Sequence, residues 1–287
     1  MEIAPLIHSR TGQCDYNSKF AVRPKDFISN IQWSRDKILS ATKNIDLLDG
    51  MHYLVASKDG VCIAGVVCTM KYFVSNCLTP DEQEEAKAYV DVQGRLYGVF
   101  LGYSFKGNTG EIPNISYSDM WQWFKNYLVP VWDRKPAETV EVPYTELDGK
   151  NYVGTTIIPI ETFNNTSFYD LGNDEKLFEM YLSKASAEDV AFCSNVDRLK
   201  SLEDGVYTAV STSQGIISRY RDKLRQIEEE TLRKASEEEA KKNKSNKPLP
   251  PNISTSRHTQ SNNSFPILKI CILILIVIVM LVLLLKD

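Results

Sequence analysis

The chain has 287 residues, of which 43% are hydrophobic and 24% are charged. This composition is typical of a folded globular protein and excludes a disordered or collagen-like chain. The formal net charge is −4, but residues 1–218 hold 20 Lys and Arg against 29 Asp and Glu, so this part carries −9. A globule this acidic is poorly suited to a phosphate backbone, which is bound by basic residues. We therefore expect no nucleic-acid partner.

Strand-like and helix-like segments alternate over residues 1–212, which predicts an α/β or α+β fold with a mixed sheet. The predicted strands, in chain order, cover residues 3–8, 20–23, 53–56, 60–70, 96–105, 152–158 and 206–211. The predicted helices cover residues 27–40, 80–89, 119–129, 174–183 and 187–195. A polar stretch at 134–150 is a candidate subdivision of the globular region 1–218.

Glycines mark two places along the predicted strands. The Asp59-Gly60 pair separates two apolar runs, which favours a β-hairpin. Gly94, Gly98 and Gly102 recur every four residues and share one face of a strand. Such a bare face permits a bend or the close crossing of a helix, and less often the approach of a ligand.

Two helix starts carry capping signals. Thr79 precedes a proline and acidic residues, so we expect it to cap the helix at 80–89. Ser186 and Asp189 have the spacing of a capping box, which predicts the start of the helix at 187–195.

Residues 219–242 are rich in Lys, Arg and Glu at helical spacing, which predicts a charged helix. Apolar or uncharged residues recur every three or four positions along its first half, at Ile217, Tyr220, Leu224, Ile227 and Thr231. This pattern is shorter than the three or four heptads of a sustained coiled coil. The stripe is therefore expected to pack on the globular region, with pairing to another chain in a short coiled coil as the alternative.

Residues 267–285 form a nineteen-residue stretch in which Lys269 is the only charged residue. A helix of this length spans about 28 Å, close to the hydrocarbon thickness of a bilayer. Lys269 lies between Ile267 and Ile270, near the start, where its long side chain can reach the head groups. We therefore predict one transmembrane helix that ends at Leu285.

The segment before this helix predicts the orientation. Residues 243–266 are polar and rich in Ser, Asn and Pro, which is typical of a flexible linker. Basic residues at 241–247 and Arg257 precede the helix, whereas Lys286 alone follows it, so the N-terminal domain is expected in the cytosol. The start of the chain shows no secretory signal.

The layout resembles the tail-anchored class of membrane proteins, a resemblance confined to the last twenty or so residues. The membrane-fusion SNARE family has a similar layout, but it carries a much longer heptad motif directly before its anchor.

The cysteines and His52 are the residues with potential chemistry. Cys62, Cys68 and Cys77 lack the paired short spacings of a zinc site and are typical of small core side chains, so no metal and no cofactor is expected. A nucleophilic pair of Cys62 or Cys193 with His52 is the alternative, because such pairs meet in space and not in sequence. The common nucleotide-binding and hydrolase motifs are absent from the sequence.

Aromatic residues are concentrated at 121–132. Trp121, Phe124 and Leu128 share one helix face that is suited to the core. Core packing is the favoured role of this aromatic cluster. Trp123 and Trp132 are the candidate binding residues if they are exposed, because an exposed tryptophan is a frequent anchor at protein interfaces.

These observations lead to one functional hypothesis and one alternative. The hypothesis is a tail-anchored, single-pass membrane protein whose cytosolic domain is a binding, adaptor or sensor-effector module. Its partners are the lipid bilayer and either another protein or a second copy of the chain. One variant is a conflict or immunity effector that clusters and perturbs the bilayer. The alternative is a membrane-anchored enzyme such as a cysteine hydrolase.

Overall fold

The computed structural model describes residues 1–16, 20–42, 50–136 and 138–245. The predicted anchor at 267–285 and the predicted linker from residue 246 onward lie outside the described residues. Among the helices that are described, none is both long and apolar enough to cross a membrane.

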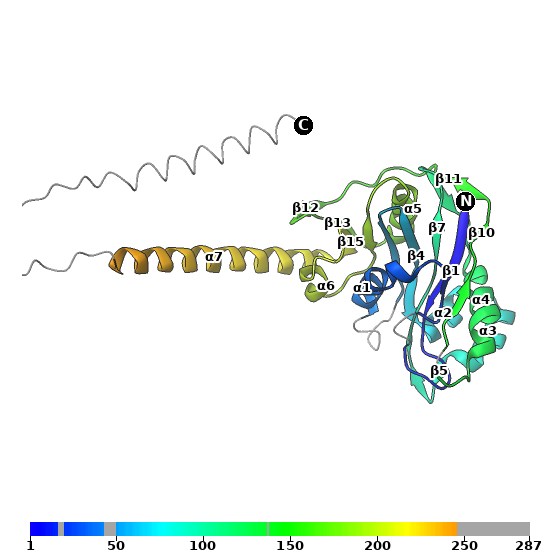
Figure 1. The fold of residues 1–287 in the computed structure, drawn as a ribbon. Coiled ribbons are helices and arrows are strands. Elements are labelled where there is room, and N and C mark those ends of the chain that lie inside the picture. The colour runs from blue at the N-terminus through cyan, green and yellow to red at the C-terminus, as the bar shows by residue number, and fades with distance from the viewer. Residues whose placement is uncertain (17–19, 43–49, 137, 246–287) are drawn as a thin grey trace, which may run out of the picture. The chain divides into compact units, whose positions relative to one another are not determined.

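A large mixed sheet forms the centre of the domain (Figure 1). Its order is β12-β13-β15-β14-β3-β4-β7-β1-β2-β9, and β10 also pairs with β1. In chain order, the strands are β1 (Glu2–His8), β2 (Val22–Pro24), β3 (His52–Lys58), β4 (Val61–Thr69), β7 (Gly98–Lys106), β9 (Val140–Val142), β10 (Thr145–Glu146), β12 (Glu161–Phe163), β13 (Thr166–Asp170), β14 (Ala191–Cys193) and β15 (Ala209–Thr212). The β13–β15, β15–β14 and β2–β9 pairs are parallel, and the remaining pairs are antiparallel. The expectation of a domain of helices and strands with a mixed sheet, α/β or α+β, is thus confirmed.

Two small antiparallel pairs stand apart from this sheet. These are β5 (Asp91–Val92) with β6 (Arg95–Leu96), and β8 (Glu111–Pro113) with β11 (Gly149–Asn151).

Helices cover both faces of the sheet (Figure 1). The α-helices are α1 (Ile31–Thr42), α2 (Met70–Cys77), α3 (Pro80–Ala86), α4 (Tyr117–Trp123), α5 (Asp174–Ala185), α6 (Leu199–Glu203) and α7 (Gln214–Ser245). Short 3-10 turns precede α1 (Ile28–Asn30) and follow α3 (Lys87–Tyr89), and α4 continues into a π-turn (Phe124–Leu128) and a 3-10 turn (Val129–Val131).

The core is divided between the two faces of the sheet. One cluster, with Val55 of β3, includes side chains of α2, α4 and α5, and the other, with Leu54, includes side chains of α1, α6 and α7. Successive residues of a strand point to opposite faces, so one strand supplies both clusters. Both faces of β3 and β4 are buried, which explains why their sequences are almost continuously apolar.

Local signals in the sequence placed several elements correctly. Asp59 and Gly60 both have positive φ, 52° and 78°, and form the two-residue turn between β3 and β4. Thr79 caps α3 in a capping box with Glu82.

The helix predicted at 187–195 is wrong. Helix α5 ends at Ala185, and Ala191–Cys193 is the strand β14, which pairs with β3 on one side and β15 on the other. This segment lies between β15 and β3 in the sheet, and other elements separate it from both strands in the sequence. Tertiary pairing therefore overrides the local capping signal.

The strand predicted at 152–158 is also wrong. Residues 152–158 lie between β11 and β12 without regular secondary structure, and Val153 is 92% exposed. The β-branched composition that favours a strand finds no neighbouring strand to pair with among the described residues.

Contacts divide the chain at Thr231/Leu232. Within the first unit, Ile217 and Tyr220 of α7 are buried and Leu224 is half-buried, whereas Ile227 is 50% exposed. In the second unit, the described residues are the helical stretch 232–245. The fold and the sites described below belong to the first unit.

Candidate functional site: an aromatic pocket beneath α5

Cys62 and His52 lie at opposite ends of the β3–β4 hairpin. His52 is paired with Val67, whereas Cys62 is paired with Ser57. Five residues of strand separate these positions, which corresponds to about 17 Å. The structure therefore does not bring the Cys62 thiol to the His52 ring.

Cys193 lies nearer to His52, but both side chains bond to a backbone carbonyl. The His52 Nδ1 atom is 2.7 Å from the Ser194 carbonyl oxygen, and the Cys193 thiol donates to the same oxygen over 3.6 Å. Burial raises the pKa of the Cys193 thiol to about 12 and that of Cys62 to about 11. Burial also lowers the pKa of His52, which the hydrogen bond to Ser194 partly offsets. Both thiols are therefore protonated at neutral pH, whereas a cysteine nucleophile reacts as the thiolate.

Cys68 is fully buried as well, and burial raises its pKa. Among the described residues, no group of three or more His, Cys, Asp and Glu is arranged to hold a metal ion.

The two candidate tryptophans differ in position. Trp132 is 9% exposed and packs against Tyr89 and Phe124, with ring centroids 5.1 and 5.7 Å away. Trp132 therefore fills the core behind the turn at 129–131 and is not exposed as an interface anchor would be. Trp123 is half-buried, and its ring meets that of Tyr103 edge-on at 6.2 Å.

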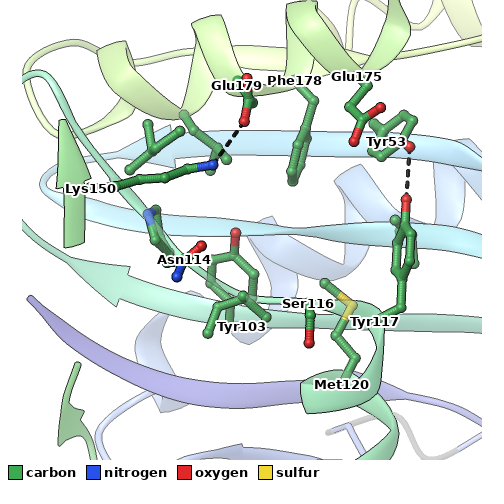
Figure 2. A pocket seen from close by; sticks show the side chains of 15 residues that line it. Tyr53, Tyr103, Asn114, Ser116, Tyr117, Met120, Lys150, Glu175, Phe178 and Glu179 are labelled. Carbon is green, nitrogen blue, oxygen red and sulfur yellow. Dashed lines mark hydrogen bonds and ion pairs between the residues drawn. The ribbon is translucent and has the colours of Figure 1, made fainter. Parts of the chain in front are cut away.

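Tyr103 belongs to the aromatic pocket, a cavity of about 230 Å³ between the sheet and α5 (Figure 2). Its lining residues are Tyr53, Val66, Tyr103, Ile112, Pro113, Asn114, Ile115, Ser116, Tyr117, Met120, Lys150, Glu175, Phe178, Glu179 and Leu182. They come from β3, β4, β7, β8, the loop after β8, α4, β11 and α5.

Strand register builds the floor of the aromatic pocket. Tyr53 pairs with Val66, and Ala64 and Val66 pair with Tyr103 and Leu101 of β7. Tyr53, Val66 and Tyr103 therefore point to the same face of three adjacent strands.

Helix spacing builds the roof. Glu175, Phe178, Glu179 and Leu182 of α5 follow one another by three, one and three residues, which places them along one side of the helix. Phe178 points from α5 into the pocket, and its ring is tilted on that of Tyr53 at 5.1 Å (Figure 2).

Most polar groups around the pocket are paired. The hydroxyls of Tyr53 and Tyr117 are 2.8 Å apart, and Lys150 Nζ lies 3.1 Å from a carboxylate oxygen of Glu179. Burial raises the pKa of both Tyr53 and Tyr117, so both hydroxyls keep their protons at neutral pH. Ser116 caps α4, and its hydroxyl donates to Asp119.

The Tyr103 hydroxyl is the unpaired group that belongs to a buried residue. Tyr103 is only 2% exposed, yet its hydroxyl makes no hydrogen bond with any described residue and points into the cavity (Figure 2). Burial raises the pKa of Tyr103, so the hydroxyl is a neutral group that can both donate and accept. Buried tyrosine hydroxyls usually have a partner, so this group is available to a bound molecule.

The sequence analysis missed these pocket residues. Tyr53, Tyr103 and Phe178 are far apart in the chain, and only the sheet register and the position of α5 bring them together. The one local signal is the spacing of Phe178 and Leu182 on α5, which indicates a buried helix face but not a cavity.

Comparisons of the chain with protein-family models, with curated proteins and with solved structures found no match.

Proposed function

We propose that this chain is a single-pass membrane protein whose N-terminal α/β domain is a binding module on the cytosolic face of a bilayer. Residues 267–285 are the anchor, 243–266 the linker, and the aromatic pocket the binding site. The observation that carries the anchor is the run from Ile270 to Leu285, which consists only of Ile, Leu, Val, Met and Cys. At roughly −0.3 to −0.6 kcal/mol for each of its Leu, Ile and Val residues, insertion of this run gains on the order of −4 to −8 kcal/mol.

Two features of the domain support a binding role. The aromatic pocket combines aromatic and aliphatic side chains with polar groups that can orient a ligand. The thiols that an anchored cysteine hydrolase would use are buried and protonated, so they give that alternative no support.

Membrane insertion is tested by fractionating cells that express the full chain. We expect the protein to remain in the pellet after alkaline carbonate extraction, and residues 1–218 to be digested only when protease reaches the cytosolic side. A double variant, Ile276→Lys with Val279→Lys, is expected to move into the soluble fraction, because each central lysine costs about 2.5–3.5 kcal/mol. The matched control, Ile276→Leu with Val279→Leu, stays in the pellet.

Recovery of the full chain in the soluble fraction would overturn the proposal. Digestion of the domain by protease added outside the cell would overturn the orientation.

A further inference from the structure

We propose that the aromatic pocket receives one Trp or Tyr side chain of a partner peptide that also carries a Lys or Arg beside it. The ring lies between Phe178 and the sheet, its N–H or O–H group meets the Tyr103 hydroxyl, and the positive charge lies at Glu175. This inference rests on the proposed binding role of the domain and specifies its ligand.

The unpaired hydroxyl of Tyr103 favours an occupant that presents a polar atom to it. Tyr103 is 2% exposed. Its ring packs against the rings of Trp123 and Phe105, with ring centroids 6.2 and 5.9 Å away. The hydroxyl therefore keeps its direction toward the pocket (Figure 2). A purely aliphatic occupant would leave this group without a partner, whereas an indole N–H or a phenol O–H satisfies it.

The size of the cavity favours a single side chain. Its volume is about 230 Å³, whereas pockets for drug-sized ligands measure about 300–1,000 Å³. Its walls include the rings of Tyr53, Tyr117 and Phe178, against which an aromatic ring stacks or packs edge-on.

The charges at the rim favour a cation. Among the lining residues, Lys150 is paired with Glu179 at 3.1 Å, and Glu175 is a further, exposed carboxylate. No ion-pair partner of Glu175 is found among the described residues, so the rim has an excess negative charge. The acidic character of residues 1–218 adds to this field. A basic residue beside the buried ring therefore complements the site.

A selection experiment tests the ligand without assuming its full sequence. The full-length protein in lipid nanodiscs is used to select from a library of displayed random 12-residue peptides. We expect enrichment of peptides with one Trp or Tyr flanked by Lys or Arg. The affinity of the most enriched peptide is then measured for the wild type and for pocket variants.

The variants separate the two contacts. Tyr103→Phe removes only the hydroxyl and is expected to weaken binding about five- to tenfold, as the loss of one hydrogen bond does. Glu175→Gln removes the charge of an exposed side chain, and should weaken binding about two- to threefold and reduce its salt dependence. The matched control is Tyr169→Phe, which removes a buried hydroxyl that bonds to Tyr181 outside the pocket, and should leave binding unchanged.

The inference is overturned if no peptide is enriched, if the enriched peptides lack an aromatic residue, or if Tyr103→Phe binds as tightly as the wild type. Tryptamine carries the same ring, N–H group and positive charge, and should displace the selected peptide. If tryptamine binds to the wild type but no peptide is enriched, the claim that the occupant is a peptide side chain is overturned. If the chain is anchored but no peptide is selected, this inference alone is refuted. If the chain is soluble but selects such peptides, the proposed anchor alone is refuted.

Discussion

The buried imidazole of His8 links one residue to the pH dependence of the whole fold. His8 is 2% exposed on β1, its ring stacks on Tyr16 at 5.2 Å and meets Phe20 edge-on at 5.6 Å, and its Nε2 atom has no hydrogen-bond partner. Burial, together with the smaller effect of the positive charge of Arg35, lowers the pKa of His8 to about 4. The folded state therefore holds His8 neutral under conditions in which an unfolded chain would protonate it.

This difference predicts an acid-side loss of stability. Between pH 6.5 and about 4, the unfolded chain binds a proton at His8 and the folded chain does not, so the free energy of unfolding falls as the pH is lowered. From pH 7.5 to 5, the loss from this group is about 2 kcal/mol. In His8→Phe, urea unfolding at the two pH values should show a decrease smaller by about this amount. An unchanged difference between the two pH values would contradict the buried neutral state.

At the scale of elements, the strands β4 and β7 approach each other unusually closely where Gly65 faces Gly102. A Cβ atom on Gly102 would lie 2.2 Å from the Ala64 carbonyl oxygen and 2.9 Å from the Gly65 Cα atom. The glycine pattern noted in the sequence thus serves a strand–strand approach at Gly102, whereas Gly94 lies in a turn with a positive φ of 75°. At Gly102, the absence of a side chain therefore permits the close approach of a neighbouring strand, and not the close crossing of a helix.

Gly102→Ala tests this approach. Because the nearest atom belongs to the backbone and the buried Phe100 ring lies 2.6 Å from the added Cβ atom, the strands must separate, and we expect the free energy of unfolding to fall by about 1–3 kcal/mol. Gly215→Ala is the matched control in α7, where the nearest atom is 3.9 Å away, so stability should be unchanged or rise by up to about 1 kcal/mol. Equal effects of the two substitutions in denaturant unfolding would show that the strand approach is not tight.

At the scale of the whole molecule, the described core ends before the second unit. Both core clusters, with the side chains packed against them, are complete by Leu224, and the first unit ends at Thr231. The acidic domain has its large sheet, its two buried faces and the aromatic pocket within this unit. Its folding energy therefore comes from residues ahead of the proposed linker and anchor.

A chain cut after Lys247 should consequently fold as the full chain does. We expect its thermal midpoint to lie within about 2 °C of that of the full chain, because a change below about 1 kcal/mol shifts a domain of this size by only a few degrees. Circular dichroism and scanning calorimetry, with the full chain in nanodiscs as the reference, provide the measurement. A fall of 10 °C or more would mean that the residues after Lys247 stabilise the domain.

The sequence by itself determined that the domain combines helices with a mixed sheet, and it determined the β3–β4 hairpin and the cap of α3. These features depend on residue periodicity and on contacts between neighbours in the chain, such as Asp59 with Gly60 and Thr79 with Glu82. It also carries the prediction of the anchor at 267–285, which rests on composition and length alone.

Tertiary structure decided the features that depend on distant partners. Ala191–Cys193 is a strand because β3 and β15 lie on either side of it, although its local sequence favours a helix. Of the candidate site, the sequence singled out Trp123, which lies behind Tyr103, but not the pocket itself. The pocket exists because three strands and α5 bring Tyr53, Tyr103 and Phe178 together, and no local pattern encodes which side chains meet across a sheet.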